Sequence, residues 1–273
     1  MPILKTVSEL QNKAKENRRT IIEMLAKSKS GHPGGSLSVT DILTVLYYHE
    51  MKFDPKNPKS EERDRFVLCK GHAAPAQYAA LADLGFFDKS HLMTLRQLGS
   101  ILQGHPERTH TPGVETFTGS LGQGLSVASG MAMAFKLDKK SNRVYAVMGD
   151  GDAYEGQTWE AMATVPHHKL DNLVVIMDRN KIITDGSTEK IKGLDSMAEK
   201  AKAFGWHTIE IDGHDIAQIL KALEEAKATK GKPTFIVANT VKGKGVSFME
   251  GKEKYHGVAP TQEEKEKALL ELA

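Results

Sequence analysis

Five short apolar runs alternate with helical segments along this chain, and that alternation restricts the fold more than any other feature of the sequence. Runs of this length, bounded by polar or glycine-containing turns, are typical of buried strands. They are RFVLC (65–69), RVYAVM (143–148), LVVIMD (173–178), HTIEI (207–211) and TFIVAN (234–239). Between and beside them, helices are expected near 74–84, 121–137, 154–168, 195–204 and 214–230. The alternation predicts one α/β domain with a mostly parallel sheet flanked by helices.

Three further helices are expected outside this alternation. Thr6-Val7-Ser8-Glu9 is a capping-box pattern that opens a helix ending near Lys27, and a second helix should cover 39–50. The C-terminal stretch TQEEKEKALLELA (261–273) is charged and has few apolar residues, which predicts a short peripheral amphipathic helix. We therefore expect the main domain to span residues 1–260, followed by a helical tail at 261–273.

Composition and charge exclude several classes of protein. A net charge of +2, with lysines interspersed among acids, gives no basic face for a nucleic acid. No apolar run approaches the length of a membrane span, and the N-terminus lacks a signal-peptide core. The single cysteine, Cys69, excludes an intrachain disulfide and suits a reducing compartment, where it is expected as a small buried residue. A cytoplasmic protein with neither a nucleic-acid nor a membrane partner is expected.

The second apolar run leads directly into Gly149-Asp150-Gly151, a turn that places a carboxylate between two glycines. One interpretation is a tight turn whose Asp begins the next helix, since Asp is a common N-cap. A dinucleotide fingerprint is disfavoured because Tyr154 stands where a small residue is needed. A P-loop is excluded as well, because Gly251-Lys252 is followed by Glu253.

The segment after this turn favours a ligand site. A helix near 154–168 and a strand at 173–178 complete a β-α-β unit, and the second strand ends at Asp178-Arg179-Asn180. Asp150 and Asn180 should then lie side by side at the carboxyl edge of the sheet, where open α/β sheets bind ligands. One carboxylate and one amide oxygen suit Mg²⁺, which commonly completes its shell with substrate phosphates. The helix that opens near Tyr154 offers free N–H groups to such phosphates.

At this point the chain resembles a known family. Gly-Asp-Gly followed about thirty residues later by NKIITDG is similar to the thiamine diphosphate motif, and nearly the whole chain resembles the N-terminal, diphosphate-binding half of transketolase. The segments that carry the resemblance are KSGHPGGSLS (29–38), KGHAAPAQYAAL (70–81), RQLGSILQGHPE (96–107), PGVETFTGSLGQGLSVASGMAMA (112–134), GDGDAYEGQTWEA (149–161), NKIITDG (180–186), HDIAQI (214–219) and VKGKGVSFMEGKEKYHG (241–257).

The resemblance implies a metal and cofactor site. Asp150, Asn180 and the carbonyl of Ile182 correspond to ligands of Mg²⁺, for which Ca²⁺ or Mn²⁺ could substitute. Gly151 would give its N–H to the diphosphate. The cofactor rings and phosphates would be contacted by a further set: His72, Gly119, Ser120, Leu121 and His256, with Glu155 beside them. Glu155 and Glu160 are candidates for a carboxylate network across a subunit interface.

The candidate histidines each adjoin a glycine in a turn that exposes the backbone, and they are His32, His72, His105 and His256 out of eleven in the chain. Imidazoles titrate near neutrality and suit contacts with hydroxyl groups and proton transfer. The resemblance places His32 and His105 in a sugar channel, and with His256 they are the candidate catalytic residues. His167-His168 is expected at the surface, and the other five histidines receive no role.

The implied activity is that of the N-terminal subunit of a split transketolase, which moves a two-carbon ketol unit from a ketose phosphate to an aldose phosphate. The sequence ends before the pyrimidine-binding domain and its activating glutamate, so we expect a separate C-terminal subunit, with two chains of each kind in a heterotetramer. GGSLS after Pro33 is similar to the two-subunit versions, whereas Thr184 replaces an apolar residue common in the family. The sugar pair is left open. Alternatives are a subunit like deoxyxylulose-phosphate synthase, one like the alpha subunit of a 2-oxo-acid dehydrogenase, or a non-catalytic cofactor-binding regulator.

Overall fold

The structure is a computed structural model that describes residues 3–273. A five-stranded parallel sheet forms the centre of the protein. The strand order is β1-β2-β3-β7-β6, all parallel. The bounds are β1 Arg65–Leu68, β2 Val144–Gly149, β3 Leu173–Arg179, β6 His207–Asp212 and β7 Thr234–Asn239. Each agrees within one residue with a predicted run. The prediction of an α/β fold with a mostly parallel sheet is therefore confirmed. Short apolar runs that alternate with helices are typical of strands buried on both faces of such a sheet.

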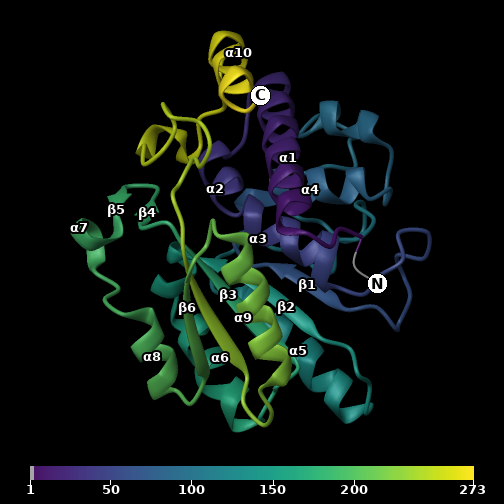
Figure 1. Cartoon of the computed structure of the whole chain (residues 1–273), viewed down its shortest axis with the longest axis vertical. Helices are drawn as coiled ribbons and strands as arrows, with labels where there is room; N and C mark the ends of the chain where they lie inside the picture. Colours follow the sequence, from purple (N-terminus) through teal and green to yellow (C-terminus); the bar gives the residue numbers. More distant parts are fainter. Residues whose placement is uncertain (1–2) are drawn as a thin grey trace.

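Successive side chains of the strands point alternately into two separate hydrophobic cores, one on each face of the sheet. Phe66, Tyr145 and Ile176 belong to the core under α1, α3, α4 and α9. Val67 and Ala146 belong to the core under α5, α6 and α8. Figure 1 shows the sheet enclosed between these helix layers. The period of two along each strand thus explains why both faces are covered.

The helices agree with the predicted segments, with differences at their ends. They are α1 Val7–Ser28, α2 Pro33–Ser38, α3 Thr40–Val45, α4 Ala74–Asp83, α5 Gln123–Leu137, α6 Gly156–His167, α7 Thr188–Lys192, α8 Met197–Ala203, α9 Ile216–Ala228 and α10 Gln262–Glu271. The capping box at Thr6 and Glu9 is present. The helix predicted at 39–50 is divided into α3 and a π-helical turn at Leu46–Glu50. No sequence pattern predicted α2, a short buried helix that begins after His32.

Two short excursions surround the carboxyl ends of β2 and β3. A 3₁₀ turn at Asp150–Tyr154 separates β2 from α6, so α6 begins two residues later than expected. After β3 the chain forms a small antiparallel hairpin, β4 Ile182–Ile183 with β5 Gly186–Ser187, which leads into α7. These excursions bring Asp150 and Ile182 to the same edge of the sheet.

The C-terminal tail forms α10, which lies beside α1 (Figure 1). Ala268 and Leu272 are buried in the core that α1 also enters. Arg19 of α1 donates hydrogen bonds to the carbonyls of Leu269 and Leu272, at 2.8 and 3.1 Å. The tail is a helix as expected, with its apolar side fixed on the main domain.

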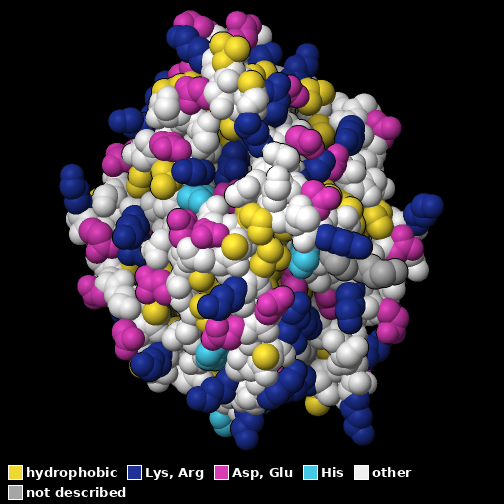
Figure 2. Space-filling view, in the orientation of Figure 1, with side chains coloured by type: hydrophobic (Ala, Val, Ile, Leu, Met, Phe, Trp, Pro, Cys, Tyr) yellow, Lys and Arg dark blue, Asp and Glu magenta, His cyan; other side chains and the backbone are white. Residues whose placement is uncertain are grey.

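The surface carries both signs of charge. Figure 2 shows Lys and Arg interspersed with Asp and Glu over the face in view. Within residues 3–273, none of the helices is both long enough and apolar enough to cross a lipid bilayer.

Candidate active site

A cavity of about 230 Å³ opens where the carboxyl ends of β1, β2 and β3 meet. Parallel strands end at the same edge, so the residues that follow them converge there. Its lining comes from many separate segments: His32, Gly35, Lys70, His72, His105, Gly119, Leu121, Gly149, Asp150, Gly151, Asp152, Asn180, Ile182, Ile183, Thr184, Lys242 and His256.

Asp150 supplies a buried carboxylate on one side of the cavity. Its Oδ2 accepts a hydrogen bond from the backbone N–H of Lys181 at 2.7 Å, and its Oδ1 pairs with the Arg179 guanidinium. Burial raises the pKa of Asp150, and Arg179 opposes that rise. An ionised carboxylate has about four acceptor positions, so two contacts leave capacity for a cation.

Two further oxygens flank this carboxylate. The Asn180 Oδ1 accepts a hydrogen bond from the backbone N–H of Ile182 at 3.2 Å, and the Ile182 carbonyl accepts one from the Lys242 ammonium at 2.8 Å. Within residues 3–273, no three His, Cys, Asp or Glu side chains are grouped in a way that could hold a metal ion. A cation at Asp150 would therefore have to take an amide and a carbonyl oxygen from the protein, with other ligands from a bound molecule or water.

A buried ion pair lies at the floor of the cavity. Lys70 is 1% exposed and Asp178 is fully buried, and the Lys70 ammonium contacts Asp178 Oδ2 and donates to the Gly35 carbonyl at 3.0 Å. Ser38 and Thr240 also donate to the Asp178 carboxylate, Ser38 at 2.6 Å. Burial opposes the charge of Asp178, but Lys70 and these donors hold its pKa below the usual value.

Three histidines form a cluster above this floor. The ring centroids of His32 and His72 are 5.2 Å apart, those of His72 and His256 5.2 Å, and those of His32 and His256 5.6 Å. Burial lowers the pKa of His32 to about 4 and that of His256 to about 3, and it lowers the pKa of His72 strongly. The imidazoles are therefore neutral at pH 7, so each ring has one donor and one acceptor nitrogen.

A buried nitrogen of this cluster lacks a hydrogen-bond partner among residues 3–273. The Nδ1 atom of His32 is buried and makes no hydrogen bond to any of residues 3–273. A buried polar atom without a partner is unfavourable unless a ligand or water satisfies it. His105 lies at a more exposed part of the lining, and burial together with Arg96 lowers its pKa.

Lys242 brings a second cation into the cavity. Its ammonium lies 2.6 Å from the Nδ1 atom of His256, in addition to its bond with the Ile182 carbonyl. Burial, reinforced by the charge of Lys70, lowers the pKa of Lys242 to about 7. The carboxylates of Asp178 and Asp150 oppose this lowering, and an anion bound beside Lys242 would likewise favour its charged form.

The loop 119–122 closes the cavity and is held by Asp152. This buried carboxylate accepts hydrogen bonds from the N–H groups of Gly122 at 3.0 Å and Gly149 at 2.9 Å. Gly122 has a φ of 83°, and a Cβ there would lie 2.4 Å from the Cβ of Glu155. Glycine at 122 is therefore required both by the backbone conformation and by this close approach.

Most of the predicted site residues lie in this lining: His32, His72, His105, Gly119, Leu121, Asp150, Gly151, Asn180, Ile182 and His256. Ser120 and Glu155 do not line the cavity, and Glu155 and Glu160 are both exposed to solvent. Thr184 does line it, and its hydroxyl lies 3.3 Å from the Nε2 atom of His256.

Sequence reasoning missed Lys70, Asp178 and Lys242 as parts of the site. The available signal was a lysine beside glycine in KGH (70–72) and VKGKG (241–245), the same signal that selected the histidines. Of the histidines without a role, His214 pairs with Asp41 at 2.7 Å, which Arg18 also contacts, and so joins a structural network. His167 and His168 are exposed, as predicted.

Comparisons with known proteins identify the family of the chain. A family model described as "Transketolase, thiamine diphosphate binding domain" matches residues 10–271. A 6-deoxy-6-sulfo-D-fructose transketolase subunit from Clostridium sp. (strain MSTE9) is 46% identical over 264 residues, covering 97% of this chain and 96% of that protein. An apulose-4-phosphate transketolase subunit from Phocaeicola vulgatus is 43% identical over 267 residues, covering 98% of this chain and 95% of that protein.

Longer relatives match over part of their length. Human transketolase is 41% identical over 259 residues, which cover 94% of this chain and 41% of that protein. The crystal structure of transketolase from Campylobacter jejuni superposes with a TM-score of 0.93 at 38% identity, covering 98% of this chain and 43% of that one. These matches confirm the resemblance and the fold inferred from the sequence. The chain therefore belongs to the transketolase family, and it carries that family's thiamine diphosphate-binding domain.

Proposed function

We propose that this chain is the diphosphate-binding subunit of a two-chain transketolase. The complete enzyme would transfer a two-carbon ketol unit from a ketose phosphate to an aldose phosphate, using thiamine diphosphate and Mg²⁺. Two relatives of nearly the same length are named as transketolase subunits. The matched part of human transketolase is 41% of that protein. Because the two relatives are named as subunits, we infer that the functions of the remaining part come from a separate chain.

The observation that supports this proposal is that one cavity contains both potential oxygen ligands for a metal and ammonium groups. Asp150, Asn180 and the Ile182 carbonyl lie on one side, and Lys70 and Lys242 reach the same space. A divalent cation with a diphosphate needs both features, since the metal takes oxygen ligands and the phosphates need positive charge. The unpartnered His32 Nδ1 is a further sign that a polar ligand belongs there. The residues present thus fit the cofactor.

Asp150, Asn180 and the Ile182 carbonyl would hold the Mg²⁺ ion, for which Ca²⁺ or Mn²⁺ could substitute. The N–H of Gly151 and the Lys242 ammonium would bind the diphosphate. Thiamine diphosphate, when bound, supplies the carbanion chemistry of the reaction, and the protein supplies orientation and electrostatics.

The remaining lining would position the body of the cofactor. Gly119 and Leu121 border the cavity on the loop that Asp152 fixes, and His72 lies within the histidine cluster. Ser120 and Glu155 are assigned to the same task by resemblance. They stand outside the present lining, so their contacts would depend on a second chain or on the bound cofactor.

His32, His105 and His256 would bind sugar hydroxyl groups and transfer protons. Neutral imidazoles can accept a proton from one hydroxyl and donate one to another, and the lowered pKa values of all three histidines keep them neutral at pH 7. Lys242 contacts His256 Nδ1, so it fixes which nitrogen of His256 faces a substrate.

The partner would be a C-terminal subunit with the pyrimidine-binding domain, assembled as a heterotetramer of two chains of each kind. The test is to express both chains separately, purify them and assay ketol transfer before and after mixing. D-xylulose 5-phosphate, fructose 6-phosphate, apulose 4-phosphate and 6-deoxy-6-sulfo-D-fructose should be offered as donors, each with an aldose phosphate as the acceptor of the two-carbon unit. We expect activity only in the mixture. Turnover by this chain alone, free of contaminating enzyme, would contradict the two-chain assignment.

The metal assignment has its own test. Asp150→Ala should abolish Mg²⁺-dependent binding of thiamine diphosphate to the assembled enzyme while the fold is retained. Asp138→Ala, which removes an exposed carboxylate outside the cavity, is the matched control. Titration calorimetry with and without Mg²⁺ measures both, and an unchanged affinity in Asp150→Ala would refute the assignment.

A further inference from the structure

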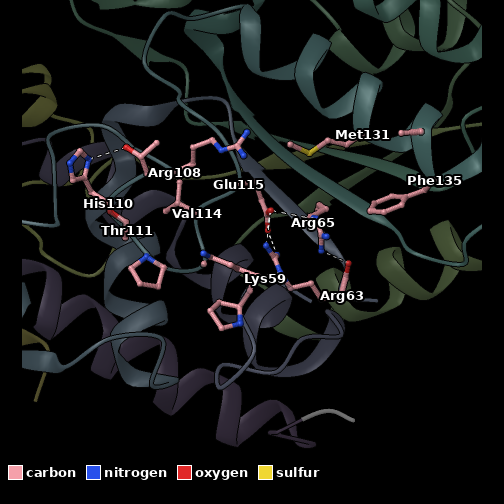
Figure 3. A pocket seen from close by; sticks show the side chains of 15 residues that line it. Lys59, Arg63, Arg65, Arg108, His110, Thr111, Val114, Glu115, Met131 and Phe135 are labelled. Carbon is pink, nitrogen blue, oxygen red and sulfur yellow. Dashed lines mark hydrogen bonds and ion pairs between the residues drawn. The ribbon is translucent and has the colours of Figure 1, made fainter. Parts of the chain in front are cut away.

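A second cavity, larger than the first and sharing no lining residue with it, lies beside the edge strand β1. Its volume is about 630 Å³. The segment before β1, the loop 108–115 and the outer side of α5 enclose it, as Figure 3 shows. Nothing in the proposed ketol transfer uses this space, which we call the arginine cavity.

A single carboxylate at its centre is shared by two arginines. The guanidinium of Arg63 pairs with Glu115 through both nitrogens, one of them at 2.9 Å from Oε2, and the Nε of Arg65 lies 3.5 Å from the same Oε2 atom (Figure 3). One negative charge therefore faces two positive charges. Burial lowers the pKa of Arg65, and the charge of Arg63 adds to that effect. An anion in the cavity would compensate the remaining charge.

Backbone carbonyls hold both arginines in place. Arg63 Nε donates to the carbonyl of Pro58 at 2.6 Å, and Arg65 donates to the carbonyls of Arg63 and Ser60 at 2.6 and 3.1 Å. The positive centre is thus pre-formed, which reduces the conformational entropy that these side chains lose when a ligand binds.

Two more cations lie at the rim. Lys59 and Arg108 are exposed, and within residues 3–273 neither side chain forms an ion pair. His110, also at the rim, is engaged by Glu107. Among the lining residues, the cations Lys59, Arg63, Arg65 and Arg108 outnumber the one carboxylate, Glu115. Asp64 and Glu61, which also act on Arg65, lie outside the lining.

The opposite wall is apolar. Met131, Ala134 and Phe135 of α5 line it, and the Arg65 guanidinium lies 5.5 Å from the centre of the Phe135 ring. Figure 3 shows Met131 and Phe135 on the far side of the Arg63–Glu115–Arg65 group from His110. An inorganic ion alone would leave this wall in contact with water, so the lining favours a ligand with an apolar part as well as a charge.

We propose that the arginine cavity binds a small organic anion, one that carries a phosphate, sulfonate or carboxylate group on an apolar or aromatic body. The volume falls in the range of small-molecule pockets, about 300–1,000 Å³. The acid group would lie between the rim cations and the arginine pair, and the apolar body against α5. The site is independent of the proposed ketol transfer, and the measurement of ligand binding does not require the cofactor.

The probe is 8-anilinonaphthalene-1-sulfonate, an aromatic sulfonate whose fluorescence increases in apolar surroundings. It should bind the full chain saturably with one site, and added inorganic phosphate should raise its apparent Kd. Reversing the rim charges with Lys59→Glu and Arg108→Glu together should weaken binding at least tenfold. Filling the cavity with Ala134→Trp, which changes no charge, should do the same.

The matched control is Lys221→Glu with Lys232→Glu, two exposed lysines outside the cavity, and it should leave the Kd within twofold. Circular dichroism would confirm that every variant is folded. Equal affinity in all variants would overturn the proposal. It would also be overturned if the partner chain displaced the probe and the Lys59→Glu, Arg108→Glu variant failed to assemble, because the cavity would then be a protein interface.

Discussion

Replacing Lys70 by methionine tests whether the floor of the active-site cavity is an electrostatic unit. Methionine is of similar length but carries no charge, so Asp178 would lose its counter-charge while remaining fully buried. Removing one partner of a buried ion pair typically costs about 3–5 kcal/mol. Ser38, Thr240 and Asn180 still donate to the Asp178 carboxylate, so we expect a loss of about 3 kcal/mol in the free energy of unfolding.

The double variant Lys70→Met, Asp178→Asn distinguishes two causes of lost stability: the loss of contacts made by Lys70, and the unpaired buried charge of Asp178. Both charges are absent in it, so no buried ion is left unpaired, and we expect it to be more stable than Lys70→Met alone. Lys140→Met is the control, because its partner Glu61 is 82% exposed and such pairs contribute about 1 kcal/mol or less. Urea unfolding of the chain without cofactor gives the three values, with m-values checked for a common transition.

The pH dependence has a defined sign. The folded-state pKa of Asp178 lies below its ordinary value of 3.8, so the pair stabilises the protein fully above that value and loses its effect as the pH falls through the folded pKa. The difference between the native chain and Lys70→Met should therefore shrink in acid. A loss below about 1 kcal/mol at pH 7, or a double variant less stable than Lys70→Met, would refute the reasoning.

Further predictions concern α5 and the histidine cluster. Gly130→Ala should stabilise the chain by about 0.5–1 kcal/mol in urea unfolding, because a Cβ there meets nothing within 4 Å. Gly124→Ala should destabilise the chain by about 1–3 kcal/mol, because its Cβ would lie 2.8 Å from the Cα atom of Cys69, the residue that follows β1. A stability change of the same sign in both variants would contradict this prediction. His32→Ala and His256→Ala should each lower kcat of the assembled enzyme about 10²-fold while thiamine diphosphate affinity stays within about threefold, and normal turnover on every competent sugar pair would refute their role. The thermal midpoint of the cofactor-free chain should fall as the pH drops from 6.5 toward 4, because burial lowers the pKa of His32 to about 4 and the unfolded chain therefore takes up protons first. His32→Gln should have a flatter profile by circular dichroism, and an identical slope would count against this explanation.

The sequence by itself determined the sheet and the position of the oxygen ligands, Asp150 and Asn180, that we propose for the metal. Each strand is a run of apolar residues bounded by turn residues, a local pattern that needs no knowledge of the neighbours. Asp150 and Asn180 follow two strands of one β-α-β unit, and parallel strands of such a unit end at the same edge. Both residues can therefore be identified from the sequence alone. The histidines of the site could be selected from the sequence because each adjoins a glycine, and glycine indicates a turn that exposes the backbone.

Only the tertiary structure decided the cationic side of the site and the second cavity. Lys70 and Asp178 are 108 residues apart, and their pairing depends on the order of β1 and β3 across the sheet. Lys242 approaches Ile182 and His256 because a loop after β7 returns to the same edge. The arginine cavity forms where the segment before β1, the loop 108–115 and α5 pack together. Charged side chains from distant segments shift one another's pKa values and are buried together only in the folded protein. No periodic pattern in the sequence predicts which of them will be in contact.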